Sequence, residues 1–383
     1  MDYRGKKILI LEGYARQCLP FMRSFKKRGC EVSILCKSRL DIGYVSRYAD
    51  RRILGICDPE RYEESRDFIC DLVKRNSYDL VLPLVDFSAR ILSENKAELS
   101  QYARVASNEP DVFAVSQDKL SVMRVCMENG VSCPKTLTEA GSIDEVVAAD
   151  LTYPIVVKPR RGCGAKGFHR YDSEEELRSF GDEANMRDYV VQEYIPQSDS
   201  NLAVNLFIDD NGETKTAFTY ASRRWFPLKG GTGTLNELVD RPDAVEIAKK
   251  LAAALGLRGF AGIDLIDDPR DGVPKVIEVN PRILACAKIG FDGGVDLGEL
   301  LLEKEFGQTV RERNSYKTGI YSRMAQTDVL WFLKSPDRWK VKPSWFRLKG
   351  TKDQTFSWRD PAPWFAFLIQ GLIRVKSEIE KRS

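Results

Sequence analysis

Short apolar runs alternate with amphipathic stretches along the first hundred residues of this chain. The expected elements are, in chain order, a strand over 6–13, a helix over 16–29, a strand over 30–37, a helix over 59–77, a strand over 78–86 and a helix over 87–102. Strands that alternate with helices are typical of a doubly wound parallel sheet. We therefore expect residues 1–105 to form one small α/β domain.

Beyond residue 105 the pattern changes to mixed α+β. The expected elements are a helix and loop over 116–136, a strand, glycine loop, strand and helix over 153–180, a strand over 188–196, a hairpin over 201–225, a helix over 242–257 and paired strands over 259–267 and 274–283. Strands that follow one another through short turns indicate antiparallel sheets rather than a parallel barrel.

The strand KVIEVNPRI (275–283) places an acid and an amide among apolar residues. A period of two puts Glu278 and Asn280 on one face with Val276, about 6.6–7 Å apart along the strand, while Ile277 and Val279 face the other way. Two adjacent polar side chains on such a strand predict a binding role. A hairpin face exposed to water is the alternative.

The preceding strand carries a second acid on the matching face. A hairpin would bring Asp264 opposite Glu278. Two carboxylates and the amide oxygen of Asn280 make an oxygen-only ligand set, which suits Mg²⁺ bound together with substrate phosphates. Arg282 follows directly and would clamp a phosphate or a carboxylate beside such a site.

The loop RRGCGAKG (160–167) follows a strand that carries Lys158. Its glycines would let backbone N–H groups approach an anion, and the lysine would neutralise phosphate charge. The loop is not a Walker A motif, because GxxxxGK[ST] is absent. An ordinary turn beside a solvated lysine is the alternative.

Composition narrows the function classes. The chain of 383 residues has a net charge of +3, which argues against a nucleic-acid-binding polycation. A single histidine, His169, and cysteines without a CxxC spacing argue against a zinc site, so we expect reduced thiols in a cytoplasm. The first turn, LEGYAR, lacks GxGxxG, which argues against a nicotinamide site. No apolar run is long enough to span a membrane.

The C-terminal part departs from this composition. Residues 331–383 hold five of the six tryptophans, and 12 Lys and Arg against 5 Asp and Glu. A basic, tryptophan-rich segment fits a surface that meets an acidic partner or a membrane interface. The alternative is an extension whose tryptophans pack back on the body as core.

Several motifs follow one another along the chain, namely Lys119 of SQDK, Lys158 of VVKP, the glycine loop, QEYIP (192–196), Asp264 and EVNPR (278–282). Taken in this order, they resemble the ATP-grasp superfamily, in particular its carbamoyl-phosphate-synthetase-like and carboxylate–amine ligase branch. The resemblance implies an α/β N-terminal (pre-ATP-grasp) domain over 1–105 followed by a two-subdomain α+β ATP-grasp fold that clasps ATP. The small subdomain would cover 106–190, the large subdomain 191–325, and a Trp-rich basic extension 326–383.

The resemblance also implies roles for individual residues. The ATP-binding residues would be Lys119, Lys158, the flap residues Arg161, Gly162, Gly164 and Gly167, the adenine-pocket residues Gln192, Glu193, Tyr194 and Ile195, and Asp199 at the ribose. The ligands of two Mg²⁺ ions, which Mn²⁺ could replace, would be Asp264, Glu278 and Asn280. The transferring phosphoryl group would be stabilised by Arg282 and Lys158, and Arg223, in preference to Arg224, would be a further cation on the phosphate side or the substrate side.

Three positions and one stretch depart from the family pattern. Cys163 replaces a small polar residue of the loop, Gln197 stands where Pro-Gly is common, and Asp199 is shorter than the family's glutamate. The continuation ILACAKIG (283–290) is not the Ser- or Gly-rich sequence that helps to bind the acceptor, so the acceptor cannot be carried over.

The resemblance implies an ATP- and Mg²⁺-dependent ligase that activates a carboxylate as an acylphosphate and joins it to an amine. The alternatives are a carbamoyl-phosphate-type enzyme that stops at the phosphorylated acid, and a non-catalytic ATP-binding protein. The expected partners are a small acid and an amine, or an acidic glycan or precursor, and a second copy in a homodimer, but no nucleic acid. We expect a cytoplasmic protein, with contact to the inner face of the membrane through the basic segment.

Overall fold

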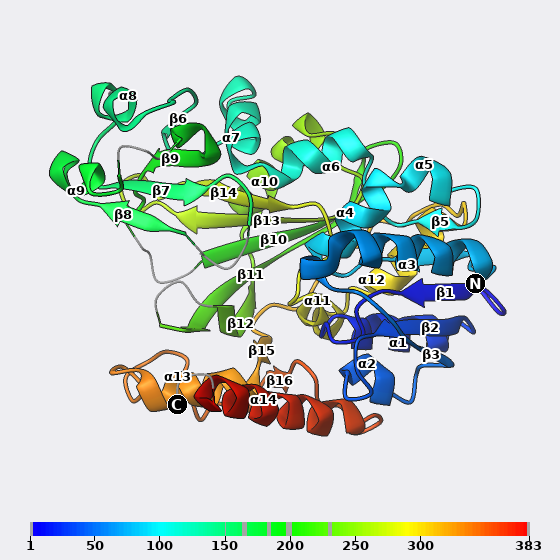
Figure 1. Ribbon diagram of the computed structural model, residues 1–383. Helices are drawn as coiled ribbons and strands as arrows, with labels where there is room; N and C mark the ends of the chain where they lie inside the picture. Colours follow the sequence, from blue (N-terminus) through cyan, green and yellow to red (C-terminus); the bar gives the residue numbers. More distant parts are fainter. Residues whose placement is uncertain are drawn as a thin grey trace.

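The computed structural model describes residues 3–149, 151–162, 167–181, 185–196, 201–228 and 232–380, with side chains to residue 373. Its elements form three sheets (Figure 1). Of the helices described, none has the length and apolar character needed to cross a bilayer.

The N-terminal sheet is parallel, as predicted, with the order β3-β2-β1-β4-β5. Its strands are β1 (Lys7–Ile10), β2 (Glu31–Cys36), β3 (Arg51–Leu54), β4 (Leu80–Leu82) and β5 (Arg104–Val105). Its helices are α1 (Cys18–Lys27), α2 (Ile42–Val45), α3 (Tyr62–Arg75), α4 (Asp86–Glu94) and α5 (Lys96–Leu99). Ile8 and Ile10 enter one core and Leu9 and Leu11 the other, because both faces of the sheet are covered. The sequence pattern missed β3, β5 and α2, which are too short to show a period.

A four-stranded antiparallel sheet follows, with the order β6-β9-β7-β8. Its strands are β6 (Thr136–Leu137), β7 (Ile155–Pro159), β8 (His169–Tyr171) and β9 (Tyr189–Glu193), and its helices are α8 (Ile143–Ala148) and α9 (Glu174–Arg178). Val157 and Val191 are the buried centre of a small core beneath those helices.

The largest sheet is antiparallel apart from its last pair and runs β14-β13-β10-β11-β12-β15-β16. Its strands are β10 (Asn201–Ile208), β11 (Thr214–Phe226), β12 (Thr232–Val239), β13 (Gly259–Asp267), β14 (Pro274–Asn280), β15 (Tyr321–Arg323) and β16 (Thr351–Asp353). One face packs on α7 (Lys119–Glu128) and α10 (Pro242–Ala254), with α6 (Pro110–Gln117) nearby. The other face meets the N-terminal domain, where Phe207 and Phe218 share a core with Phe21 of α1 and with α11 (Lys288–Gly293) and α12 (Leu297–Glu305).

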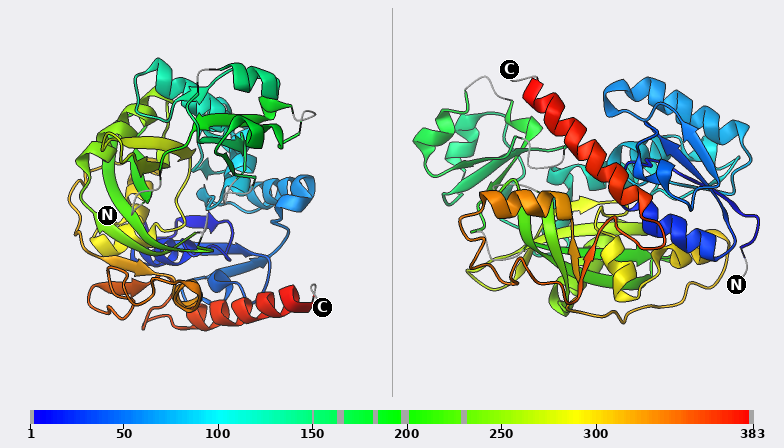
Figure 2. Two further views of the ribbon diagram at one scale, coloured as in Figure 1. Left: turned by 90° about the vertical axis from the view of Figure 1, so that its left-hand side faces the viewer. Right: turned by 90° about the horizontal axis from the view of Figure 1, so that it is seen from below.

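The C-terminal segment, residues 321–380, is partly integrated into this body. After β15 come α13 (Ala325–Lys334), β16 and α14 (Ala362–Glu380), which packs against α2 along the outside of the molecule (Figure 2). The hydroxyl of Ser46 donates to Asp360 at 2.6 Å. Trp331 is buried beneath Arg224, whereas Trp339 and Trp358 are exposed. The alternative, in which the tryptophans pack back on the body as core, therefore holds for Trp331 but not for Trp339 and Trp358.

Candidate functional site

A row of residues crosses four neighbouring strands of the large sheet. Glu278 on β14 lies opposite Asp264 on β13, which lies opposite Ala203 on β10, which lies opposite Tyr220 on β11. Directly opposed residues of antiparallel strands project to one face. The predicted pairing of Asp264 with Glu278 is therefore present, and the small Ala203 leaves space between the carboxylates and the Tyr220 ring.

The pattern of period two fails at one position of β14. The register shifts between Asp264 and Leu265, so that Leu265 pairs with Val276 and Ile277 is left over. Val276 consequently packs in the core with Val279, contrary to the predicted face, and Ile277 lies beside Glu278 at the cavity described below. A bulge of one residue cannot be detected from alternation alone.

The two carboxylates repel each other in a buried setting. Burial and the charge of Glu278 raise the pKa of Asp264 to about 7, although Arg282 and Asn280 oppose the shift. The Asn280 Nδ2 donates to Asp264 Oδ2 at 3.0 Å. Glu278 Oε1 lies 3.3 Å from the Lys119 Nζ.

Two lysines face these acids. Lys119 begins α7, where Asp118 accepts from the Ser121 N–H as the helix cap, and its Nζ donates to the Gly162 carbonyl at 2.7 Å. Lys158 on β7 lies within 3.5 Å of the Ile277 carbonyl, which belongs to the other sheet. Burial, with the neighbouring Lys119 charge, lowers the pKa of Lys158 to about 8. The site thus holds two carboxylates and two lysines, and of these only Glu278 and Lys119 form an ion pair.

These groups border a cavity of about 470 Å³ between the four-stranded sheet and the large sheet. The predicted residues that line it are Lys119, Lys158, Arg161, Gly162, Gln192, Glu193, Tyr194, Ile195, Asp264 and Glu278. Phe168, Leu265, Ile277 and Tyr220 also line it and were not predicted, because apolar strand residues look like core in a sequence. An apolar recess with acids and lysines at one end suits a ligand that has an aromatic part and a polyanionic part.

A family model described as the ATP-grasp domain matches residues 116–286. We call these residues the ATP-grasp segment. The cavity and both pairs of charged residues lie within this ATP-grasp segment.

Comparison with curated proteins identifies ligases. A D-aspartate ligase of Enterococcus faecium is 27% identical over 224 residues, which cover 53% of this chain and 53% of that protein. The alpha-aminoadipate–LysW ligase LysX of Sulfurisphaera tokodaii is 23% identical over 172 residues, which cover 43% of this chain and 59% of that protein. The chain therefore spans little more than half the length of these relatives.

Solved structures share the fold over most of the chain. The biotin carboxylase domain of the Hydrogenobacter thermophilus 2-oxoglutarate carboxylase, in complex with MgADP, has a TM-score of 0.65 at 17% identity and covers 82% of this chain and 73% of its own. The N5-carboxyaminoimidazole synthetase of Staphylococcus aureus, complexed with ADP, has a TM-score of 0.65 at 17% identity, with coverage of 84% and 82%. The match extends beyond the ATP-grasp segment into the N-terminal α/β domain.

The two arginines predicted to be catalytic, Arg282 and Arg223, lie outside the cavity lining. The guanidinium of Arg282 donates to Asp86 Oδ1 at 2.8 Å and to Asn280 Oδ1 at 3.0 Å. Arg223 donates to Glu237 at 2.7 Å. Both cations are thus paired, and the oxygen of Asn280 faces Arg282 rather than the two carboxylates. The described residues contain no group of three Cys, His, Asp or Glu side chains arranged to hold a metal.

The remaining predicted ligands differ in their setting. The Gln192 Nε2 donates to Thr136 Oγ1 at 2.8 Å, so its amide links β9 to β6 within the four-stranded sheet. Gly167 has φ +70°, a conformation that favours glycine. A Cβ at this position would also lie 2.8 Å from Pro159 Cγ, so any larger residue would clash. Gly164 and Asp199, like Cys163, lie outside the described residues.

Proposed function

We propose that this chain is an ATP- and Mg²⁺-dependent carboxylate–amine ligase. One observation carries the proposal. At one end of the cavity, inside the ATP-grasp segment, the carboxylates of Asp264 and Glu278 face the ammonium groups of two lysines, Lys119 and Lys158. The names of the relatives, a D-aspartate ligase and an aminoadipate ligase, support the reaction class. The domain boundaries at 105, 190 and 325 belong to the same proposal.

Nucleotide binding is assigned to the cavity. The apolar walls at Ile195 and Leu265 suit an adenine ring, and the backbone of residues 192–195 runs along the same wall. Lys119 and Lys158 would neutralise the phosphates, and the flap with Arg161, Gly162, Gly164 and Gly167 would cover them. Asp199 is assigned to the ribose.

The acid pair fits a divalent cation. Burial and the charge of Glu278 raise the pKa of Asp264 to about 7, and a hard cation between the two carboxylates would relieve their repulsion. Asp264, Glu278 and, after a turn of its amide, Asn280 would hold Mg²⁺ or Mn²⁺, with Glu278 shared between two ions. The bound metal would withdraw negative charge from the phosphates during transfer.

The reaction is assigned two steps. A carboxylate oxygen of the acid attacks the γ-phosphorus of ATP, the bond to the β-phosphate oxygen breaks, and ADP leaves. The amine then attacks the carbonyl carbon of the acylphosphate, loses a proton, and expels phosphate to leave an amide. Lys158 and Arg282 are assigned to the charge of the transferring phosphoryl group, and Arg223 would need to leave Glu237 to join them.

An ADP-release screen tests the activity. The full chain with Mg²⁺ and ATP is challenged with pairs of carboxylic acids and amines, and products are identified by mass. An amide together with stoichiometric ADP supports the ligase. Trapping of an acylphosphate by hydroxylamine without amide formation indicates the carbamoyl-phosphate-type alternative. Nucleotide binding that no acid stimulates indicates a non-catalytic protein.

The C-terminal segment is proposed to contact an anionic membrane surface from the inner face. Its apolar side chains are unusually exposed, with Leu348 at 79% and Trp358 at 89%, and Trp339, Phe346, Phe365 and Leu372 are exposed as well. Lys and Arg outnumber acids in residues 331–383 by 12 to 5, which complements anionic lipid. The double variant Trp339→Ser/Trp358→Ser should lose cosedimentation with phosphatidylserine vesicles and keep its melting temperature. A concentration-dependent dimer that the same variant dissolves would instead assign this face to a homodimer.

A further inference from the structure

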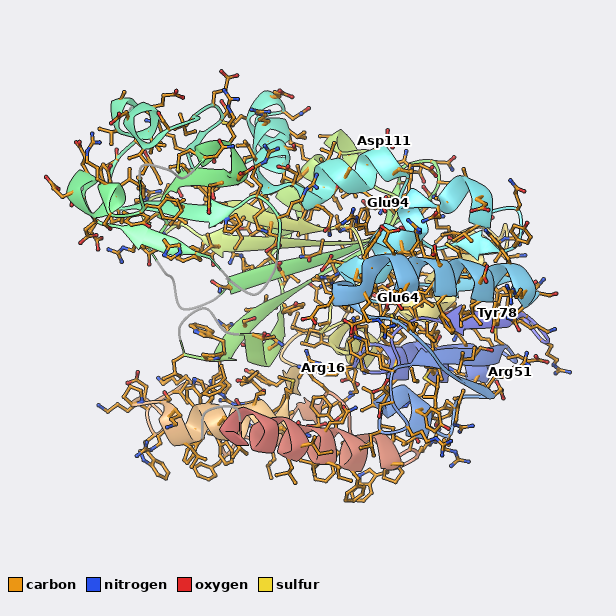
Figure 3. The ribbon with its side chains drawn as sticks, viewed as in Figure 1. Arg16, Arg51, Glu64, Tyr78, Glu94 and Asp111 are labelled. Carbon is orange, nitrogen blue, oxygen red and sulfur yellow. The ribbon has the colours of Figure 1, made fainter. Side chains whose placement is uncertain are left out.

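Arg16 is a partly buried arginine whose charge is not matched by an acid. It lies in the loop between β1 and α1, where the N-terminal domain meets the C-terminal segment (Figure 3). Its guanidinium contacts the sulfur of Met324, and no carboxylate of the described residues lies within 4.0 Å. By contrast, Arg224 and Arg282 each hold a carboxylate at hydrogen-bond distance. Burial of an unpaired guanidinium is costly, so this position indicates a missing anion.

The nearby groups do not supply that anion. Desolvation lowers the pKa of Arg16, and the groups that oppose the shift are Cys286, Tyr220 and Asp353. Burial raises the pKa of both Cys286 and Tyr220, which keeps them neutral. The Asp353 carboxylate acts on Arg16 only from beyond ion-pair distance, because it is held by the backbone N–H groups of Thr355 and Phe356, each at 2.8 Å.

The surroundings of Arg16 are polar and incompletely hydrogen-bonded. Asn236 Nδ2 donates to the Cys286 sulfur at 3.1 Å, and Gln354 Nε2 approaches the same sulfur at 3.8 Å. Among the residues that the structure describes, Gln354 Oε1 is buried without a partner, and Ser322 Oγ has only the weakly bonding Cys286 sulfur beside it. Buried polar atoms that lack partners are uncommon in native proteins and are satisfied when a polar ligand binds. Cys286 belongs to ILACAKIG, the stretch that departs from the family pattern.

This polar cluster is continuous with the acid pair. Ser222, Asn236 and Ser322 form a row across β11, β12 and β15, next to the row that contains Tyr220 and Asp264. Residues two apart on a strand share a face, so both rows face the N-terminal domain. Tyr220 is close enough to Asp264, Arg16 and Cys286 for each to affect its pKa. Tyr220 therefore borders both the cavity that holds the acid pair and the surroundings of Arg16.

We propose that Arg16, with Asn236, Ser322 and Gln354, binds a substrate carboxylate other than the one that is phosphorylated. The inference rests on the proposed ligase function and deepens it. It makes one of the two substrates a small molecule with a free carboxylate, either a dicarboxylic acid or an amino acid that serves as the amine. The C-terminal segment thereby contributes Ser322 and Gln354 to substrate selection.

The test compares matched probes in the full chain with Mg²⁺ and a non-hydrolysable ATP analogue. Calorimetry measures the affinity for succinate against succinamate, and for D- and L-aspartate against the corresponding asparagine, in wild type and Arg16→Gln. Each amide removes one carboxylate and keeps the shape. We expect a preference of roughly tenfold or more for at least one acid over its amide in wild type, and none in Arg16→Gln. A preference that succinate and aspartate share assigns the site to a dicarboxylic acid, whereas a preference that only aspartate shows indicates that the amino group is recognised as well.

Arg16→Lys and Arg39→Gln are the controls. Arg16→Lys keeps the charge and should retain part of the preference, whereas Arg39→Gln removes an exposed charge from the same domain and should retain all of it. Equal acid-to-amide ratios in wild type and Arg16→Gln overturn the assignment of Arg16. Failure of wild type to bind the ATP analogue overturns the proposed function itself, and the Arg16 proposal falls with it. A melting temperature within a few degrees of wild type confirms that each variant is folded.

Discussion

Asp86, at the start of α4 in the N-terminal α/β domain, holds the guanidinium of Arg282, which follows β14 of the large sheet. The same guanidinium donates to Asn280, whose amide donates to Asp264. A single chain of hydrogen bonds thus links the N-terminal domain to the acid pair. Gln117 also donates to Asp86 at 2.8 Å, so the link includes α6.

Removal of Asp86 should destabilise the protein and impair the site together. Asp86→Ala leaves Arg282 half-buried without its partner, and we expect a loss of about 2 kcal/mol in the free energy of unfolding, measured with urea. Asp71→Asn, which breaks an exposed pair with Arg75, is the control and should change stability by less than about 0.5 kcal/mol. A similar small effect for Asp86→Ala would show that the pair is not coupled to folding.

Glu278→Gln should abolish turnover without unfolding the chain. The substitution keeps the shape but removes one of the two carboxylates that would hold the metal, and we expect ADP release to fall by about a hundredfold or more. Stability should be unchanged or higher, because Glu278 repels Asp264. Glu246→Gln, on the outer side of α10, is the matched control. Unaltered ADP release in Glu278→Gln would refute the metal assignment.

Nucleotide use should decline at alkaline pH. Burial lowers the pKa of Lys158 to about 8, so its ammonium is present below pH 8 and is lost as the pH rises through that value. We expect kcat/KM for ATP, which reports the free enzyme, to fall by about tenfold per pH unit above 8. Lys158→Arg keeps its charge and should move the decline to higher pH. If Lys158→Arg shows the same dependence of kcat/KM on pH as wild type, the decline above pH 8 belongs to another group.

The C-terminal segment should be required for folding. Asp328 on α13 is fully buried and accepts from Arg224 at 2.8 Å and from Thr234 at 2.9 Å, with Arg323 at 3.2 Å. Asp328→Asn leaves two arginine charges uncompensated, and we expect it to cost about 3–5 kcal/mol in urea unfolding. Asp337→Asn, an exposed change just after α13, should cost little. Deletion of residues 331–383 should likewise unfold the protein, and a stable truncated chain would contradict this account.

Local patterns determined much of this protein. The alternation of strands and helices predicted the parallel N-terminal sheet, and the turn after Asp267 predicted the hairpin that sets Asp264 opposite Glu278. Both outcomes depend on residues that are close in the chain, where the period of side chains and short turns decide the pairing. The motifs around Lys119 and Lys158 indicated the ATP-grasp segment for the same reason.

Tertiary structure decided the rest. The bulge at Ile277 changed which side chains face the cavity, and the pairing of Arg282 with Asp86 joins residues 196 positions apart. The unmatched charge of Arg16 emerges only when the N-terminal loop, β12 and the C-terminal segment pack together. Ion pairs and orphaned polar atoms depend on which surfaces meet in three dimensions, and no sequence period records that.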